Sequence, residues 1–135
     1  ALRVLENSRS LSHGAELLRL DWSSVQRIME RAVERGLARR ELGAVRHLGM
    51  DEKSFGKGQS YISTLVDLEA DAPRVLEVVE DRDTPAAVAL LESLPAPTSE
   101  TVEAVAIDMS AAYAAAVRQV LPQADVVHDR FHVSK

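Results

Sequence analysis

The hydrophobic pattern of the chain changes its period near residues 41–45, and this change limits the possible folds. Before it, five apolar residues recur at the spacing of one helix face: Val25, Ile28, Met29, Ala32 and Val33. After it, short runs rich in Val, Ile, Leu, Thr and Tyr alternate with Gly, Pro, Asp and Ser, as is typical of strands and turns. We therefore predict an all-α module over residues 1–42 and an α/β domain over residues 43–135.

Composition narrows the class of protein. Hydrophobic residues make up 46% and charged residues 27% of the 135 residues, which is the balance of a globular protein with a buried core. The absence of cysteine excludes disulfides and thiolate zinc sites, and it fits a reducing compartment. No apolar run approaches the roughly 18 residues of a membrane span. We expect a cytoplasmic protein without a membrane partner.

Charge is divided unevenly along the chain. Residues 1–46 hold nine arginines and no lysine against six acids, whereas residues 47–135 hold seven basic and fifteen acidic groups. A basic module beside an acidic domain fits a phosphate-binding part next to a cation-binding part. Alternatively, the arginines only solvate helix faces.

The first module is predicted to contain two helices in tandem. Residues 12–20 have helical spacing, and Asp21 is a plausible N-cap for the next helix. Gly36 is predicted to end that second helix, with Leu37 folding back onto it. A short helix, a tight connection and a longer helix form a helix-turn-helix candidate. Ordinary helix packing gives the same pattern.

If this module binds DNA, the second helix would lie in the major groove. Arg27, Arg31 and Arg35 share one face and could follow phosphates, with Gln26 or Arg27 closer to base edges. Salt bridges within the helix are the alternative, because Glu30 and Glu34 lie within one turn. The DNA-binding candidates in this helix are Ser23, Ser24, Gln26, Arg27 and Arg31.

The second part is predicted to fold in the order β-β-β-α-β-α-β. The predicted strands are Val45–Met50, Tyr61–Leu68, Arg74–Glu80, Val102–Ile107 and Ala124–His128, and the helices are Thr84–Leu94 and a run capped by Ser110 that ends at Val120. The first three strands are expected to be antiparallel. The fourth is nearly all apolar, as expected of a parallel strand buried on both faces. This order is that of the ribonuclease-H-like fold, which is an α/β fold. We predict that this chain contains a truncated core of that fold.

Asp51 and Asp108 each close one of the apolar strand runs. Carboxylates just past the ends of two neighbouring strands can converge, and Mg²⁺ prefers such oxygen ligands. The alternative is that each aspartate merely begins a turn. Of these two interpretations, we predict the first, that Asp51 and Asp108 form a metal site.

Three sequence blocks carry a family resemblance. They are Asp-Glu-Lys-Ser-Phe-Gly-Lys-Gly at residues 51–58, Ile-Asp-Met-Ser at 107–110 and Asp-Arg-Phe-His-Val at 129–133. In this order they closely resemble the DDE transposases of the insertion-sequence family written ISL-three. The resemblance covers residues 43–135, and residues 10–40 resemble the helix-turn-helix that precedes the catalytic domain in that family.

The resemblance implies a ribonuclease-H-like domain that cuts and joins double-stranded DNA at transposon ends and in a target. Asp51 and Asp108 would be its first two catalytic carboxylates and would bind two Mg²⁺ or Mn²⁺ ions about 3.5 to 4 Å apart. The third carboxylate in such enzymes is a Glu after the last strand, and we expect it beyond Lys135. We accordingly expect an incomplete transposase that is inactive alone, acts at the bacterial nucleoid and forms a homo-oligomer when complete.

Further residues have weaker assignments. Asp129 and His132 resemble an Asp-x-x-His signature that would shape the site, although a separate metal site with His128 is the alternative. Lys53 and Lys57 are predicted to contact phosphates from a glycine-containing turn, or else to lie at a solvated hairpin tip. Two aromatic residues are expected in the core or at its boundary, and these are Tyr113 and Trp22.

Two other functional classes fit parts of the sequence. A helix-turn-helix regulator with an acidic ligand-binding domain would explain the uneven charge, but not an aspartate after both strands. A ribonuclease-H-like nuclease of repair or RNA removal would use the same carboxylates. Cleavage of transposon-end DNA, compared with cleavage of an RNA–DNA hybrid, separates these classes.

Overall fold

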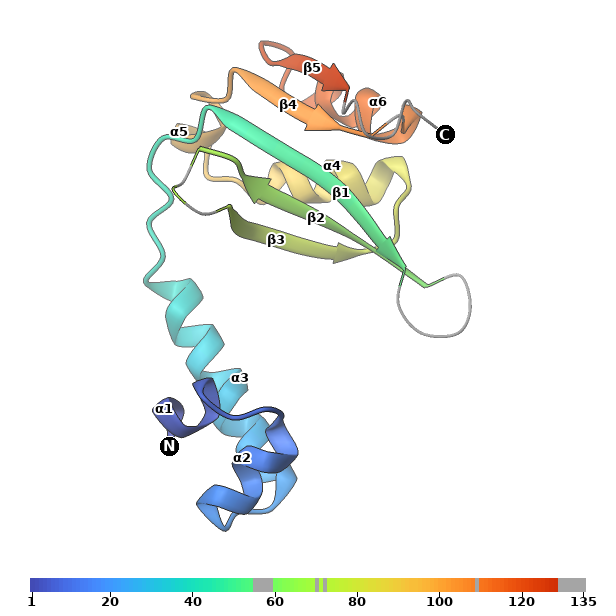
Figure 1. Cartoon of the computed structure of the whole chain (residues 1–135). Coiled ribbons are helices and arrows are strands. Elements are labelled where there is room, and N and C mark those ends of the chain that lie inside the picture. The colour runs from blue at the N-terminus through green and yellow to red at the C-terminus, as the bar shows by residue number, and fades with distance from the viewer. Residues whose placement is uncertain (55–59, 70, 72, 109, 129–135) are drawn as a thin grey trace. The chain divides into compact units, whose positions relative to one another are not determined.

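The computed structural model describes residues 1–54, 60–69, 71, 73–108 and 110–128 (Figure 1). The chain divides into two compact units, residues 1–41 and residues 42–135. Three residues with predicted roles lie outside the described residues, namely Lys57, Asp129 and His132. None of the helices in the described part of the chain has the length and apolar character needed to cross a membrane.

The first unit consists of three helices, α1 (Leu2–Glu6), α2 (Leu11–Leu18) and α3 (Trp22–Ala38). Asp21 is the N-cap of α3, as predicted, and its side chain accepts a hydrogen bond from the Ser24 amide at 2.9 Å. The helices enclose a small apolar cluster whose buried members are Leu5, Ala15 and Val25.

The predicted end of α3 at Gly36 is wrong, because the helix continues to Ala38. A glycine ends a helix by adopting a left-handed conformation, and among the described glycines only Gly43 has a positive φ, of 63°. In a helix interior, glycine costs about 1 kcal/mol relative to alanine, which is too little to end a helix of this length.

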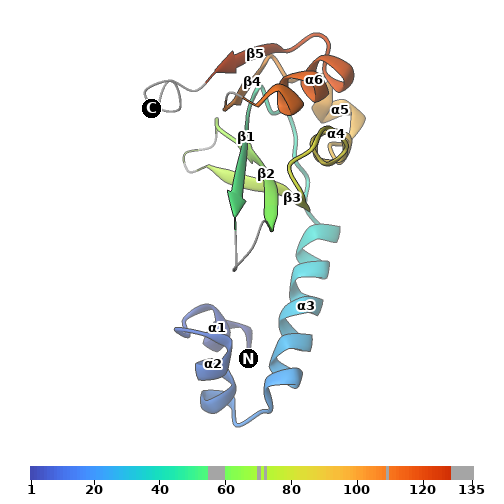
Figure 2. The ribbon, with the colours of Figure 1, turned by 90° about the vertical axis from the view of Figure 1, so that its right-hand side faces the viewer.

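The second unit is a five-stranded sheet with helices on one face (Figures 1 and 2). The strand order across the sheet is β3-β2-β1-β4-β5. Strands β1, β2 and β3 are antiparallel neighbours, whereas β4 runs parallel to β1 and β5 runs parallel to β4. The strand bounds are β1 His47–Ser54, β2 Tyr61–Asp67, β3 Arg74–Glu80, β4 Ala104–Ile107 and β5 Asp125–His128.

Helices α4 (Thr84–Glu92) and α6 (Ala111–Val120) pack against each other and against the sheet, as Figure 2 shows end-on for α4. The predicted element order is confirmed. The structure adds a short helix, α5 (Ala96–Ser99), in a segment for which the sequence predicts no helix. This mixed α/β arrangement with a five-stranded sheet is compatible with a ribonuclease-H-like core.

The core lies between the sheet and the two longer helices. Its largest fully buried side chains are those of Tyr113, Leu48, Leu65, Leu90, Leu91 and Ile107. Burying a side chain of this size contributes roughly 1.5–3 kcal/mol. Tyr113 is therefore a core aromatic, as predicted, whereas Trp22 is 52% exposed.

The prediction that the fourth strand is buried on both faces is wrong. In β4, Val105 and Ile107 are buried, but Ala104 and Ala106 are only half-buried. Within the described residues, the helices of the second unit cover one face of the sheet. Alternate residues of β4 therefore point to the uncovered face.

Candidate functional site

Asp51 and Asp108 follow the last residue pair of the parallel ladder between β1 and β4. Met50 pairs with Ile107 at that position, and each aspartate is the next residue of its chain segment. Because parallel strands run in the same direction, the two aspartates leave the ladder at the same edge of the sheet. The backbone pairing therefore places the two segments that lead to the aspartates side by side.

The prediction that Asp51 lies past the end of its strand needs correction. Strand β1 continues to Ser54, and Asp51 pairs with Thr64 in β2. The parallel ladder ends at Met50, while the antiparallel ladder with β2 extends four residues further. Asp108 does follow the end of β4, as predicted.

Alternation along β1 separates Asp51 from the core. Leu48 and Met50 are buried beneath the helices, whereas Asp51 is exposed. Successive side chains of a strand point to opposite faces, so Asp51 lies on the face without helices. Asp108 is half-buried in the turn between β4 and α6.

Each aspartate uses one carboxylate oxygen in a local hydrogen bond. The amide of Glu52 donates to Asp51 Oδ1 and the amide of Ser110 donates to Asp108 Oδ1, both at 2.9 Å. Within the described residues, Oδ2 of either aspartate has no hydrogen-bond partner, and no basic side chain forms an ion pair with them. Both carboxylates thus retain an oxygen that could bind a cation.

A third acidic ligand is not evident in the part of the chain that the structure describes. No group of three or more His, Cys, Asp or Glu side chains there is arranged to hold a metal ion. The candidate site consists of the two aspartates.

Glu52 differs from its neighbour Asp51, because it has a basic partner. Arg82 Nη1 lies 3.0 Å from Glu52 Oε1, and the guanidinium carbon lies 3.8 Å from the ring centroid of Tyr61. The sequence alone does not predict this contact. Arg82 is separated from Glu52 by two strands, and no local pattern in the sequence joins them.

Comparison with known proteins decides the family. The family model of the ISL3-type DDE transposases, described as "Transposase", matches residues 48–135. This chain belongs to that family. The transposase for insertion sequence element IS1001 of Bordetella parapertussis is 30% identical to this chain over 133 residues, which cover 98% of the chain and 32% of the relative. The chain thus spans about a third of the length of that relative.

A solved structure is also similar. It is a chain of the simian T-cell lymphotropic virus intasome in complex with the PP2A regulatory subunit B56 gamma, with a TM-score of 0.41 and 15% sequence identity. The similarity covers 67% of this transposase and 33% of that chain.

Lys53 of the transposase lies in β1, where it pairs with Ile62, and not in a turn as predicted. The antiparallel ladder of β1 and β2 extends to Ser54, which moves Lys53 out of the predicted turn. Its exposed side chain is two residues from Asp51 and therefore on the same face of the sheet.

Polar residues at the start of α3 bond mainly with one another. The hydroxyls of Ser23 and Ser24 both donate to the Asp21 carboxylate, and these bonds, together with the Ser24 amide, lower the pKa of Asp21 well below its usual range. Further along the helix, the Gln26 amide nitrogen donates to Glu30 at 2.8 Å.

Two of the predicted DNA-binding arginines line a shallow hollow on this unit. Arg27 and Arg31 line it together with Leu20, Ser24 and Ile28, and its volume is about 290 Å³. None of the ion pairs among the described residues lies in α3, so the alternative of helical salt bridging is not observed. Arg31 has no hydrogen-bond partner within the described residues, and Arg27 donates to the Ser24 hydroxyl at 3.2 Å.

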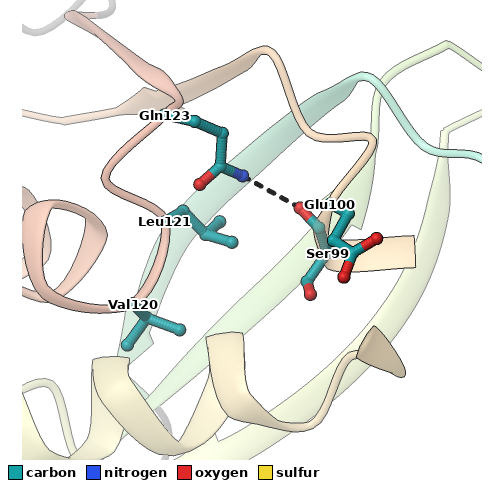
Figure 3. A pocket seen from close by; sticks show the side chains of 5 residues that line it. All are labelled: Ser99, Glu100, Val120, Leu121 and Gln123. Carbon is teal, nitrogen blue, oxygen red and sulfur yellow. Dashed lines mark hydrogen bonds between the residues drawn. The ribbon is translucent and has the colours of Figure 1, made fainter. Parts of the chain in front are cut away.

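A second hollow, of about 360 Å³, lies away from the aspartates (Figure 3). It is lined by Ser99, Glu100, Val120, Leu121 and Gln123. The Gln123 amide nitrogen donates to the Ser99 carbonyl at 3.0 Å. The hollow lies near the starts of β4 and β5, whereas Asp108 follows the end of β4, so it belongs to the opposite edge of the sheet.

Proposed function

We propose that this transposase chain contributes the metal-binding carboxylates and a DNA-binding module for transposition of a bacterial insertion sequence. In this proposal, Asp51 and Asp108 are catalytic residues for cleavage and strand transfer of DNA. The observation that carries the proposal is that the two aspartates follow Met50 and Ile107, the last pair of one parallel ladder. This pair lies inside the region that matches the transposase family.

The two aspartates fit Mg²⁺ or Mn²⁺. Both ions prefer carboxylate oxygens, and each aspartate retains an oxygen without a hydrogen bond among the described residues. Neither carboxylate is neutralised by a basic residue there, unlike Glu52 beside Arg82. A bound cation would therefore neutralise two negative groups that follow the last pair of one parallel ladder.

Bound divalent ions supply activation of water or of a DNA 3′-hydroxyl and stabilisation of the leaving oxygen in an in-line displacement. The role of the chain is to hold its carboxylates in place. Ser110 fixes Asp108 through the 2.9 Å hydrogen bond from its amide, and Asp51 is fixed within the β1–β2 ladder. Asp51 and Asp108 would hold the ions, Asp51 would be the less replaceable of the two, and no covalent enzyme intermediate would be required.

Helices α2 and α3 would act as a helix-turn-helix that binds the transposon ends. The hollow of Arg27 and Arg31 suits a DNA phosphate, and Gln26 would read a base edge once DNA replaces its bond to Glu30. The remaining contacts proposed for DNA are those of Ser23, Ser24, Lys53 and Lys57.

The proposal includes three further assignments. Asp129 and His132 would shape the catalytic site rather than bind a separate metal. The active protein would be a homo-oligomer in the cytoplasm, because two transposon ends must be joined to one target. Double-stranded DNA would be its only nucleic-acid partner.

Cleavage by variants of the full-length transposase tests the catalytic assignment. Asp51→Ala and Asp108→Ala should each abolish strand cleavage and leave binding to transposon ends intact. Asp125→Ala is the matched control, because Asp125 is an exposed aspartate at the start of β5, at the other end of the ladder. Undiminished cleavage by both test variants would sink the assignment.

DNA binding by the same protein tests the module. Arg27→Ala and Arg31→Ala should weaken binding and reduce the slope of log affinity against log salt concentration by about one each. Arg3→Ala, at an exposed arginine of α1, should leave both quantities unchanged. Equal salt slopes in all three variants would contradict the proposed phosphate contacts.

A further inference from the structure

A buried hydrogen bond joins α6 to β2. The Tyr113 hydroxyl lies 2.6 Å from Ser63 Oγ, and both residues are fully buried. Ser63 Oγ also lies 2.7 Å from the carbonyl oxygen of Asp81, to which it must donate its single hydrogen. Tyr113 is therefore the donor to Ser63, and both hydroxyls are satisfied without water.

On the Tyr113 side, further hydrogen bonds connect this Tyr113–Ser63 link to Asp108. Tyr113 is in the first turn of α6, and its amide donates to the Ser110 side chain, which caps the helix. The Ser110 amide in turn holds Asp108 Oδ1. The position of the first turn of α6 thus sets the position of the Asp108 carboxylate.

The other end of the link leads to Asp51. Ser63 pairs with Glu52 across the β1–β2 ladder, and its neighbour Thr64 pairs with Asp51. The Thr64 hydroxyl also donates to the Asp51 carbonyl oxygen at 3.2 Å. The Tyr113–Ser63 bond therefore connects α6, which follows Asp108, to β2, which pairs with the strand of Asp51, at a level of the sheet where β1 and β4 no longer pair.

The electrostatic surroundings of Tyr113 agree with this placement. Burial raises the pKa of the Tyr113 hydroxyl, and the negative charges of Glu52, Asp108 and Asp51 raise it further. The hydroxyl thus lies within the field of both candidate metal ligands. It remains protonated at neutral pH and can serve as a hydrogen-bond donor there.

We propose that Tyr113, through Ser63, is a positioning residue that fixes the spacing of the Asp51 and Asp108 carboxylates for metal binding. Hydrogen bonds along the parallel ladder end at the level of Met50 and Ile107, so the ladder alone does not hold the next residues together. The buried link supplies the missing constraint. This inference rests on the proposed function of the two aspartates.

Binding of Mn²⁺ to the full 135-residue chain tests the inference. The readout is the Mn²⁺ concentration that gives half-maximal paramagnetic broadening of the NMR signals of Asp51 and Asp108. Tyr113→Phe keeps the ring and removes the link, and we expect it to raise that concentration about three- to tenfold. Tyr61→Phe is the matched control, because Tyr61 keeps its ring against Arg82 and its hydroxyl has no hydrogen-bond partner within the described residues.

A second variant separates positioning from stability. Ser63→Ala removes the same bond from its other end, and the double variant Ser63→Ala/Tyr113→Phe should bind Mn²⁺ no more weakly than the weaker single variant. Thermal unfolding of all variants is measured alongside. Additive losses of Mn²⁺ affinity in the double variant would overturn the shared link.

The outcomes distinguish this inference from the proposed function. If Tyr113→Phe binds Mn²⁺ as tightly as the wild-type chain but unfolds at a lower temperature, Tyr113 has a purely structural role. That result would overturn the positioning role alone. Absence of broadening at Asp51 and Asp108 in the wild-type chain would overturn the proposed metal site and the inference with it.

Discussion

Asp51 and Asp108 are the first residues beyond a shared ladder, since Met50 and Ile107 form the last pair between β1 and β4. One carboxylate is thereby placed in β1 and the other directly after β4, and neither has a basic partner among the described residues. A divalent cation that binds both carboxylates would stabilise the folded state. The stability of the second unit should therefore respond to divalent cations.

The first prediction is that Mg²⁺ stabilises the chain through Asp51 and Asp108. Binding to the folded state alone stabilises it by about 1.4 kcal/mol at a concentration ten times the dissociation constant. Asp51→Asn and Asp108→Asn should each remove this response, because each removes one carboxylate of the proposed site. The measurement is thermal unfolding with and without Mg²⁺ at matched ionic strength.

Asp125→Asn is the control for this prediction, because it removes an equivalent exposed charge from β5. It should leave the Mg²⁺ response unchanged. An equal response in all three variants would mean that Mg²⁺ acts through general screening, and the prediction would then be wrong.

The sequence was sufficient to predict features that depend on local chemistry. Asp21 was identified as a cap because its side chain bonds to an amide three residues later, and the bounds of β3 agree with the prediction. Ser110 was identified as a cap for the same reason. Short-range hydrogen bonds and alternation leave a clear pattern in the sequence.

Features that depend on partners far along the chain were mispredicted or missed. The end of β1 was placed at Met50, but pairing with β2 carries the strand to Ser54. The link between Ser63 and Tyr113 spans 50 positions, and no local sequence motif joins the two residues. Such contacts are set by tertiary packing, which a single sequence does not display.

The second prediction is that a substitution in the core of one unit lowers the stability of that unit only. Leu48 is fully buried in the second unit, and Leu48→Ala should destabilise that unit by about 2–5 kcal/mol. Val25→Ala should act on α2 and α3 instead, because Val25 is buried in the separate cluster of the first unit. Amide hydrogen exchange of the intact chain reports each unit separately.

Leu17→Ala serves as the surface control, since Leu17 is 58% exposed, and it should change stability by no more than about 0.5 kcal/mol. Faster exchange throughout both units in Leu48→Ala would contradict the division at residues 41 and 42.

The third prediction concerns Asp21 and acid. The hydroxyls of Ser23 and Ser24 lower the pKa of Asp21 in the folded state below its unfolded value of about 3.9. A lowered folded pKa gives a stabilising contribution that is present above about pH 4 and is lost as the pH falls through the folded value. The stability of the first unit should therefore fall below pH 4.

Asp21→Asn retains a capping oxygen but does not titrate, so it should reduce this acid dependence while keeping α3 helical. Asp21→Ala should lower the helicity of α3 at every pH. The measurement is the amide chemical shift of Ser24 between pH 2 and pH 6, together with circular dichroism. If the wild type and Asp21→Asn lose stability equally as the pH falls, carboxylates other than Asp21 cause the loss.

The fourth prediction concerns Tyr113 and alkali. Burial first, and then the charges of Glu52, Asp108 and Asp51, raise the pKa of this hydroxyl above its unfolded value of about 10. A raised folded pKa gives a contribution that is fully present below pH 10 and is lost as the pH rises through the folded value. The stability of the second unit should fall above pH 10, and Tyr113→Phe should make that fall shallower.

Denaturant unfolding between pH 8 and pH 11 measures this loss of stability, with Tyr61→Phe as the control that keeps Tyr113. An alkaline fall equally steep in Tyr113→Phe and Tyr61→Phe would show that ionisation of Tyr113 does not cause it.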